Sequence, residues 1–389
     1  MGDAARAIAP PPDRSLPDEI TIWEILVRLP PKSLLRCRAV CRAWRSATST
    51  RRFLLAHNAL QPTLPLLYGY NFVGDEVESL DIIPFHQRAG AGELQLRPVA
   101  RLAQDSDFHH LEACCDGLLV LSFRNTRVRD WRFAVCNPAT GQYAPLPLAY
   151  GSGVEYSLLG MYPHTPTGDY RLLMFRDSVS MHHQLAPDAA QDGSYIFTLG
   201  SGQPPRHIGF LEAEVLTYIF GSLLFRGSLH WRPPGNMIMV FDTTTELFWQ
   251  MRAPAVPPGH AKLFQMDEML AMSGFNDAAT TIDIWVAQDY ESEVWACKYR
   301  VDFSVAKLTL RFGKFDESSW VVVMPSDGDV FLLVNFGEWL LHVDIGGKLV
   351  ATFHRRGLGP ANLQLKQTLV QHTFFPTVEG YVANSSPFI

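Results

Sequence analysis

The spacing of hydrophobic and polar residues changes once along the chain, near residue 60. Between residues 16 and 57, apolar residues recur at the intervals of a helix. From residue 61 onward, short runs rich in Val, Ile, Leu, Phe, Tyr and Trp are separated by Gly, Pro, Asn and Asp, as in strands joined by turns. The pattern predicts an α plus all-β protein, with a helical domain at residues 15–60 and a β-domain at residues 61–389.

The helical domain is predicted to contain several short helices. The first begins at Pro17, because proline is favoured at the first helical position and two acidic residues follow at the positive end of the helix dipole. Pro30 ends this helix, and Pro31 begins the next helical turn. Apolar residues then recur between arginines over residues 35–47, and a last short helix at residues 51–58 completes the domain.

The helical domain carries more large apolar side chains than so small a unit can bury. Excess apolar surface on a small helical unit indicates a protein partner. Burying one such side chain at an interface contributes about 1.5–3 kcal/mol. For a single residue, a place in the core and a place in the interface follow equally from the helical spacing, but Leu16, Pro17 and Pro30 favour the interface.

The motifs of the helical domain also occur in a specific order. They are Leu16-Pro17, Ile25-Leu26, Arg28-Leu29-Pro30, Ser33-Leu34 and Val40-Cys41-Arg42-Ala43-Trp44-Arg45. This stretch resembles an F-box. The resemblance implies binding to the Skp-type adaptor of a cullin ubiquitin ligase, with eight residues in contact or supporting positions: Leu16, Pro17, Ile20, Leu29, Pro30, Leu34, Val40 and Trp44.

The composition of the chain limits the class of protein to which it can belong. With 389 residues, 47% of them hydrophobic and 19% charged, the chain can bury a large core. The net charge of −6 argues against general nucleic-acid binding, although the arginines make the helical domain locally basic. A helix-turn-helix in that domain is an alternative, but Trp44 and the paired prolines suit a protein partner better.

The N-terminus and the cysteines bear on the compartment. Residues 1–14 are predicted to be a disordered leader without an apolar signal core, and the spacing of the six cysteines suggests no disulfide framework. The longest apolar run, residues 215–225, is too short to span a bilayer. We therefore expect a cytoplasmic or nuclear protein with reduced thiols and no membrane segment.

Eleven apolar runs in the β-domain are predicted to be strands. They cover residues 66–70, 117–122, 132–136, 170–175, 221–225, 237–241, 281–286, 294–301, 320–323, 330–334 and 339–343. Three blocks, beginning at Asp116, Arg226 and Asp327, repeat one pattern: a Gly before an apolar strand, a strand ending in Asn or Asp, a turn and a third strand. A repeat of about 45–55 residues predicts a β-propeller of about six blades, with seven blades or an array of β-sandwiches as alternatives.

The same blocks carry a second resemblance. The motifs are Cys115-Asp116-Gly117-Leu118-Leu119, Cys136-Asn137-Pro138-Ala139-Thr140, Gly168-Asp169-Tyr170-Arg171-Leu172-Leu173, Gly227-Ser228-Leu229-His230-Trp231, Phe241-Asp242 and Ile282-Asp283-Ile284-Trp285-Val286. They resemble the F-box-associated, kelch-like domain common in plant F-box proteins, with a departure at residues 159–162, where that family favours a Phe-Gly-Tyr-like run. The resemblance implies a domain that recruits a substrate and leaves the substrate unidentified.

These motifs also have a purely structural interpretation. Asn, Asp, Pro and Gly at these positions are turn residues, because Asn and Asp bond to their own backbone and Gly takes positive φ. Four tryptophans, Trp231, Trp285, Trp295 and Trp320, are predicted to pack between blades.

Catalytic chemistry finds little support in the sequence. His109-His110 with Cys114-Cys115 has a metal-like composition, but neighbouring residues of a strand point to opposite faces and no second ligand pair completes a site. Phosphate-binding glycine loops, zinc-protease helices and Gly-x-Ser-x-Gly elbows do not occur. We therefore expect no metal, no cofactor and no catalytic residue.

The sequence thus predicts a non-catalytic substrate receptor that joins a target protein to a Skp-type adaptor and, through it, to a cullin scaffold. The alternatives are an F-box scaffold that acts outside a ligase and a sugar-binding or enzymatic propeller. The target and the residues that bind it are unknown. Residues 177–193 and 253–259 are two loops that could contact the target or be idle surface.

Overall fold

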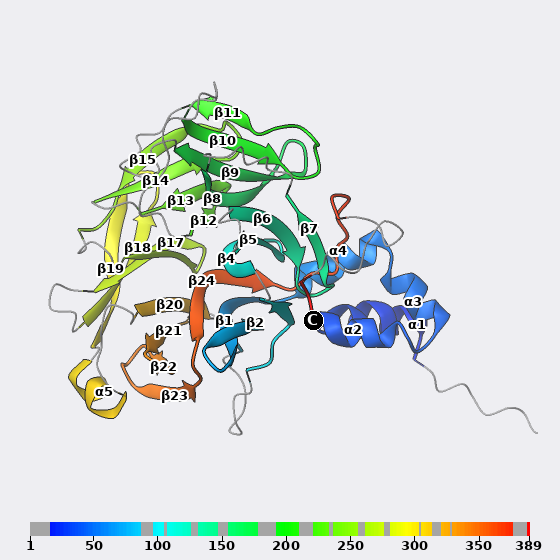
Figure 1. Ribbon diagram of the computed structural model, residues 1–389, viewed down its shortest axis with the longest axis horizontal. Coiled ribbons are helices and arrows are strands. Elements are labelled where there is room, and N and C mark those ends of the chain that lie inside the picture. Colours follow the sequence, from blue (N-terminus) through cyan, green and yellow to red (C-terminus); the bar gives the residue numbers. More distant parts are fainter. Residues whose placement is uncertain are drawn as a thin grey trace, which may run out of the picture. The chain divides into compact units, whose positions relative to one another are not determined.

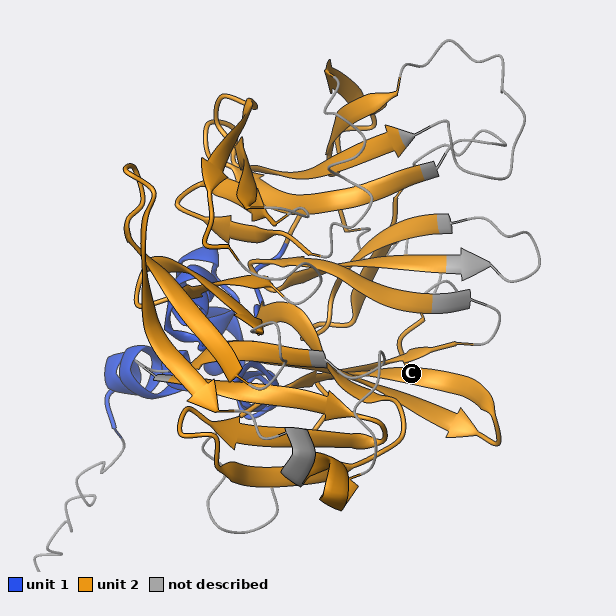
Figure 2. Cartoon of the chain, turned by 90° about the vertical axis from the view of Figure 1, so that its left-hand side faces the viewer, with its two compact units in different colours: residues 1–62, 367–371 blue, residues 63–366, 372–389 orange. Residues whose placement is uncertain are grey.

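The computed structural model describes most of the chain as two compact units (Figure 2). One unit comprises residues 1–62 and 367–371, and the other comprises residues 63–366 and 372–389. The described residues are 16–86, 96–104, 107–125, 131–146, 155–177, 192–209, 221–232, 236–255, 261–275, 281–302, 305–312, 320–326, 329–375 and 387–389. The predicted leader, residues 1–14, lies outside them.

The first unit is built from short helices. They are α1 (Asp18–Ile20), the π-helical turn η1 (Thr21–Ile25), the 3-10 turn η2 (Leu26–Arg28), α2 (Pro31–Cys37), α3 (Arg42–Thr48) and α4 (Arg51–Leu60). Pro17 is the N-cap of α1 and not its first residue, because its ψ of 137° is extended while its carbonyl already accepts the first helical bond from the Thr21 N–H at 3.0 Å. Pro31 begins α2, where its missing N–H leaves no bond unmade.

The second unit consists of antiparallel strands. They are β1 (Thr63–Val73), β2 (Glu76–Pro84), β3 (Ala100–Ala103), β4 (Asp107–Cys115), β5 (Leu118–Asn125), β6 (Trp131–Asn137), β7 (Gln142–Pro145), β8 (Glu155–His164), β9 (Asp169–Asp177), β10 (Gly193–Thr198), β11 (Arg206–Gly209), β12 (Leu223–Phe225), β13 (Ser228–Trp231), β14 (Met237–Asp242), β15 (Phe248–Arg252), β16 (Lys262–Met266), β17 (Met269–Phe275), β18 (Thr281–Asp289), β19 (Val294–Asp302), β20 (Trp320–Ser326), β21 (Asp329–Phe336), β22 (Trp339–Asp344), β23 (Leu349–His354) and β24 (Leu358–Lys366).

These strands form six four-stranded sheets, which are the blades of a propeller (Figure 1). Blade 1 has the strand order β24-β1-β2-β3, and blades 2 to 6 each use four consecutive strands from β4 to β23. The first strands of neighbouring blades contact one another, as β24 contacts β4 and β4 contacts β8, so they form the inner ring. The predicted fold class and blade number are confirmed, and each of the eleven predicted runs overlaps a strand.

Among its described residues, the β-domain contains one helix, although the sequence predicts an essentially all-β domain. It is α5 (Val305–Phe312), which lies between β19 and β20. Its sequence alternates polar and apolar residues as a strand would. The helix instead lets Leu308 and Phe312, four residues apart, pack against the core between blades 5 and 6.

The recurring Asn and Asp residues end the third strand of their blades. The Asn137 side chain oxygen Oδ1 accepts from the Ala139 N–H at 3.0 Å, and Asp242 Oδ1 accepts from Thr244 and Thr245 at 2.8 and 2.7 Å. The Gly of the pattern lies in the turn between the first two strands, where Gly117 has a φ of 84°. The interpretation of these motifs as turn chemistry is therefore confirmed.

The hydrophobic core is divided into six clusters, and each cluster lies between two neighbouring blades. Strand β13 of blade 4 is hydrogen-bonded to both neighbouring blades. This is possible because consecutive side chains of a strand point to opposite faces of the sheet. Trp231 Nε1–H donates to the Leu159 carbonyl oxygen in blade 3 at 2.7 Å. His230 Nε2 lies 2.7 Å from the Tyr290 hydroxyl in blade 5.

The predicted interblade tryptophans agree with this arrangement where they are described. Trp231 is buried between blades 3 and 4, and Trp285 packs against the cluster between blades 4 and 5. Trp295 Nε1–H of blade 5 donates to the Arg252 carbonyl oxygen of blade 4 at 3.0 Å. The side chain of Trp320 lies outside the described residues.

We expect Trp231→Phe to lower the free energy of unfolding by about 1–3 kcal/mol, because it leaves the buried Leu159 carbonyl without its donor. Trp295→Phe is the matched control, since the bond from Trp295 is solvent-exposed and water can replace it. Urea unfolding of both variants measures the difference. An equal loss in both would mean that the Trp231 bond is not a buried interblade link.

We expect stability to fall below pH 6.5 through His230. Burial lowers the pKa of His230 to about 4, so between pH 6.5 and 4 the unfolded chain binds a proton that the folded chain does not. Between pH 7.5 and 5 this linkage removes about 2 kcal/mol of unfolding free energy. In His230→Gln, urea unfolding at the two pH values is expected to show a correspondingly smaller decrease, and an unchanged decrease would refute the assignment.

Blade 1 is closed by strands from both ends of the β-domain. β24 pairs antiparallel with β1, and Arg355, which precedes β24, binds three groups of blade 1. Its Nη2 donates to the Asp81 carboxylate at 2.7 Å, to Asn71 Oδ1 at 2.9 Å and to the Gly69 carbonyl at 3.3 Å. A Cβ at residue 69 would lie 2.8 Å from the Arg355 guanidinium carbon, so any larger residue there would displace the Arg355 side chain.

Candidate functional site

The candidate site is the surface of the helical unit that carries the motif residues. Leu16, Ile20 and Val40 are 57%, 44% and 66% exposed. Pro17 and Pro30 are also exposed, whereas Leu29 and Trp44 are half-buried. Large apolar side chains held at the surface of a small unit can bind a protein partner.

Leu34 differs from the other predicted site residues, because its side chain is completely buried. It lies in the core of the helical unit with Leu26, Val27 and Phe53. Leu34 therefore occupies a supporting position and does not itself present a surface to a partner.

The corner at Leu29 and Pro30 is held by two side chains from the end of α4. The Leu29 carbonyl oxygen lies 2.8 Å from His57 Nε2 and accepts from Gln61 Nε2 at 3.2 Å. Burial lowers the pKa of His57, so the neutral ring can make this bond without a charge in the core. These bonds fix the direction in which Pro30 projects.

The position of Val40 follows from the break between α2 and α3. The helix α2 ends at Cys37, and Arg38 Nη2 donates to the Thr48 carbonyl oxygen of α3 at 2.6 Å. The Cys41 sulfur then caps α3 by accepting from the Trp44 N–H at 3.4 Å. Val40 lies in the turn between these bonds and projects outward.

Four further exposed apolar side chains were not among the predicted site residues. They are Ile25, Leu35, Leu55 and Leu60. A sequence signal was present for Leu35, because it follows the buried Leu34 and consecutive helical residues cannot share one face. We include Ile25 and Leu35 in the candidate surface, since both lie in the motif stretch.

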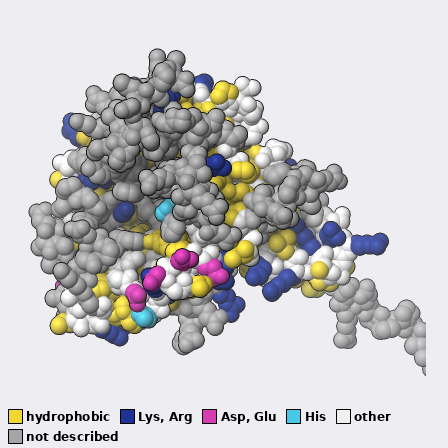
Figure 3. Space-filling model, viewed as in Figure 1, with side chains coloured by type: hydrophobic (Ala, Val, Ile, Leu, Met, Phe, Trp, Pro, Cys, Tyr) yellow, Lys and Arg dark blue, Asp and Glu magenta, His cyan; other side chains and the backbone are white. Residues whose placement is uncertain are grey.

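The candidate surface is basic as well as apolar. Residues 31–60 contain seven Lys and Arg residues and no acidic residue: Lys32, Arg36, Arg38, Arg42, Arg45, Arg51 and Arg52. In Figure 3, Lys and Arg side chains lie next to hydrophobic ones over the helical elements. Such a surface favours association with an acidic protein partner.

The metal-like residues of β4 do not form a metal site. Within the described parts of the chain, no group of three or more His, Cys, Asp and Glu side chains could hold a metal ion. His109 is buried, and burial raises the pKa of the Cys114 thiol to about 12. A thiol with so high a pKa stays protonated at neutral pH, and the thiol is a far weaker nucleophile than the thiolate.

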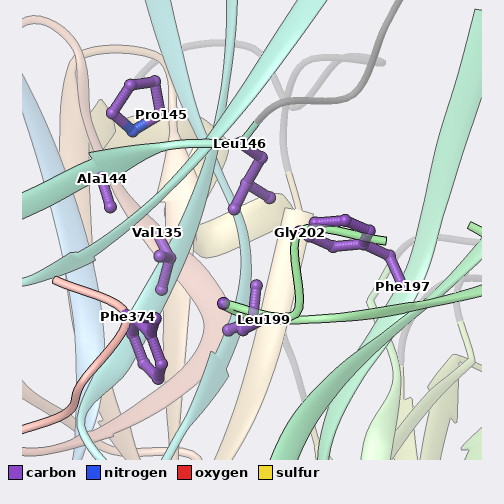
Figure 4. A pocket seen from close by; sticks show the side chains of 9 residues that line it. Val135, Ala144, Pro145, Leu146, Phe197, Leu199, Gly202 and Phe374 are labelled. Carbon is purple, nitrogen blue, oxygen red and sulfur yellow. The ribbon is translucent and has the colours of Figure 1, made fainter. Parts of the chain in front are cut away.

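The propeller has an apolar pocket of about 140 Å³ between blades 2 and 3 (Figure 4). Its lining is Val135, Ala144, Pro145, Leu146, Phe197, Leu199, Gly200, Gly202 and Phe374. None of these side chains carries an ionisable group, so the pocket suits an apolar side chain.

The two loops that the sequence suggested for target contact emerge at one face of the propeller. Residues 178–192 connect the second and third strands of blade 3, and residues 253–261 connect blades 4 and 5. Strands alternate in direction within each blade, so both connections leave the sheets at the same face. Residues 178–191 and 256–260 themselves lie outside the described residues.

Two basic residues lie at strand ends on this face. Lys262 begins β16, and Arg232 directly follows β13. Burial lowers the pKa of both side chains below their ordinary values.

The described part of the chain contains no helix that is long and apolar enough to cross a membrane. The longest apolar run in the sequence is residues 215–225, and the structure describes only residues 221–225 of it.

Comparison with known proteins identifies both units. A model of the F-box associated beta propeller domain matches residues 94–350, and an F-box-like model matches residues 13–57. F-box protein At5g49610 of Arabidopsis thaliana is 26% identical over 300 residues, which cover 72% of this chain and 77% of that protein. F-box protein At3g07870 of the same plant is 25% identical over 355 residues, which cover 84% and 82%.

Proposed function

This chain belongs to the F-box associated β-propeller family, and we propose that it recruits target proteins to a cullin ubiquitin ligase. In this role the helical unit binds a Skp-type adaptor and the propeller binds the target. We place the protein in the cytoplasm, the nucleus or both, in keeping with its six free cysteines.

The observation that carries the proposal is the exposed apolar surface of the helical unit. F-box domains in general bind Skp1-type adaptors, and the F-box-like match covers residues 13–57. Leu16, Ile20 and Val40 lie within that match and remain exposed although the unit has a buried core of its own. Their exposure fits side chains that a partner covers.

The proposed mechanism is tethering. A target held on the propeller stays near the ubiquitin-conjugating enzyme that the cullin carries, so its lysines reach a high effective concentration there. The receptor needs to bind two proteins and needs no catalytic residue. F-box and F-box-associated families are typically non-catalytic adaptors, and we propose the same for this chain.

The proposal is tested by reconstituting the ligase with purified adaptor, cullin and conjugating enzyme. Proteins captured by the propeller of a Leu16→Ala, Ile20→Ala, Val40→Ala triple variant are supplied as candidate targets. We expect at least one of them to be ubiquitylated with the wild-type receptor and not with the triple variant.

Two results would contradict the proposal. If wild type binds the adaptor but no captured protein is modified, the chain is an F-box scaffold that acts outside a ligase. If modification is equal with the triple variant, the apolar surface does not join the target to the ligase.

A further inference from the structure

The outer edge of blade 1 is occupied by residues from the far end of the sequence. The Ala103 N–H in β3 donates to the Pro387 carbonyl oxygen at 2.7 Å, and the Ile389 N–H donates to the Arg101 carbonyl oxygen at 3.1 Å. The two bonds flank an antiparallel bridge between Leu102 and Phe388. Residues 387–389 therefore extend the sheet by one short strand.

A single side chain anchors this added strand. Leu102 and Phe388 form a pair that is not itself hydrogen-bonded, the type in which facing side chains lie closest. Leu102 is completely buried, and Phe388 packs against the same core cluster between blades 1 and 2. Ile389, in contrast, is 73% exposed. Two backbone bonds and the packing of one aromatic side chain thus join residues 387–389 to blade 1.

We propose that the edge of β3 is a docking site for an extended target peptide with a central aromatic residue, and that residues 387–389 occupy this site until such a peptide displaces them. Adding a strand to an exposed sheet edge is a general mode of peptide recognition, in which backbone bonds give affinity and side-chain pockets give specificity. The chain's own segment shows which peptide chemistry fits.

The contacts described between residues 387–389 and β3 suit an exchangeable occupant. A permanent cover for a strand edge would serve to prevent aggregation. Here the cover makes two backbone bonds with β3 and inserts one partly buried ring. A tethered segment has an effective concentration in the millimolar range, so a target needs additional contacts on the propeller to displace it.

The test uses the peptide Gly-Gly-Ser-Pro-Phe-Ile with an N-terminal fluorescein, followed by fluorescence anisotropy. We expect saturable binding to a variant that lacks residues 387–389 and at least about tenfold weaker binding to the full chain, because its own segment competes. A peptide with Ala in place of Phe is expected not to bind. Phe388→Ala in the full chain keeps the backbone in place and is expected to bind the peptide more tightly than wild type.

A second substitution locates the site. Ala103→Pro removes the N–H that faces Pro387, and proline is tolerated at a strand edge. In the variant that lacks residues 387–389, it is expected to weaken peptide binding about threefold to tenfold without changing the melting temperature.

The proposal is overturned if neither the shortened chain nor folded Phe388→Ala binds the peptide, or if the full chain binds it equally well. The proposed receptor function is needed for one part of this proposal, namely that the docked peptide belongs to a target protein. Because the assay contains no adaptor, its failure would leave the adaptor-binding proposal untouched, and the reverse also holds.

Discussion

Asp81→Asn is expected to lower the free energy of unfolding by about 1.5–3 kcal/mol, because it weakens the charge-assisted hydrogen bonds that two partly exposed arginines make with one buried carboxylate. The Asp81 side chain is 3% exposed and binds Arg101 and Arg355 at 2.6 and 2.7 Å. Arg355 precedes β24, whereas Asp81 lies on β2, so the substitution weakens the sheet in which the propeller closes. Urea unfolding followed by tryptophan fluorescence measures the loss.

Asp283→Asn provides a matched control within another blade. Asp283 and Arg300 face each other on β18 and β19, as Asp81 and Arg101 do on β2 and β3. Among the described residues, no second arginine binds Asp283 as Arg355 binds Asp81, and the Arg300 side chain is 66% exposed. We expect a clearly smaller loss than for Asp81→Asn, and equal losses would show that Arg355 does not secure the closure.

The Asp81 site also predicts a pH dependence. Burial acts to raise the pKa of Asp81, but the hydrogen bonds from Arg101 and Arg355 outweigh it and hold the pKa below its ordinary value. A carboxylate with a lowered folded pKa stabilises the protein at neutral pH, and that stabilisation is lost as the pH falls through the folded pKa, below about pH 4. Asp81→Asn should abolish this part of the acid sensitivity.

The propeller could be predicted because its turns are encoded locally. Asn137 and Asp242 satisfy nearby backbone N–H groups with their own side chains, so each marks the end of a third strand wherever it recurs. The sequence does not predict the turn between β16 and β17, because its two positive-φ positions are occupied by Asp267 and Glu268 and not by glycine. Their φ angles are 47° and 59°. The pairing of β24 with β1 could not be predicted, since it joins residues about 300 positions apart that share no local signal.

The candidate site was predictable in its residues but not in their exposure. Leu34 and Val40 are both apolar and both match the motif, yet Leu34 is buried and Val40 is exposed. The difference arises because α2 ends at Cys37 and the intervening turn shifts the helical phase. A periodicity argument assumes one continuous helix and cannot detect such a shift.

The most direct test of the account is the affinity of the chain for a purified Skp-type adaptor, measured by biolayer interferometry. We predict that wild type binds and that Leu16→Ala, Ile20→Ala, Val40→Ala binds at least about a hundredfold more weakly, because each lost apolar contact contributes up to about 1.5–3 kcal/mol. Leu55→Ala, Leu60→Ala is the control, since these leucines are similarly exposed on α4 outside the predicted site. Normal binding by this control would support the account, whereas no binding by wild type, or an equal loss in the control, would contradict it.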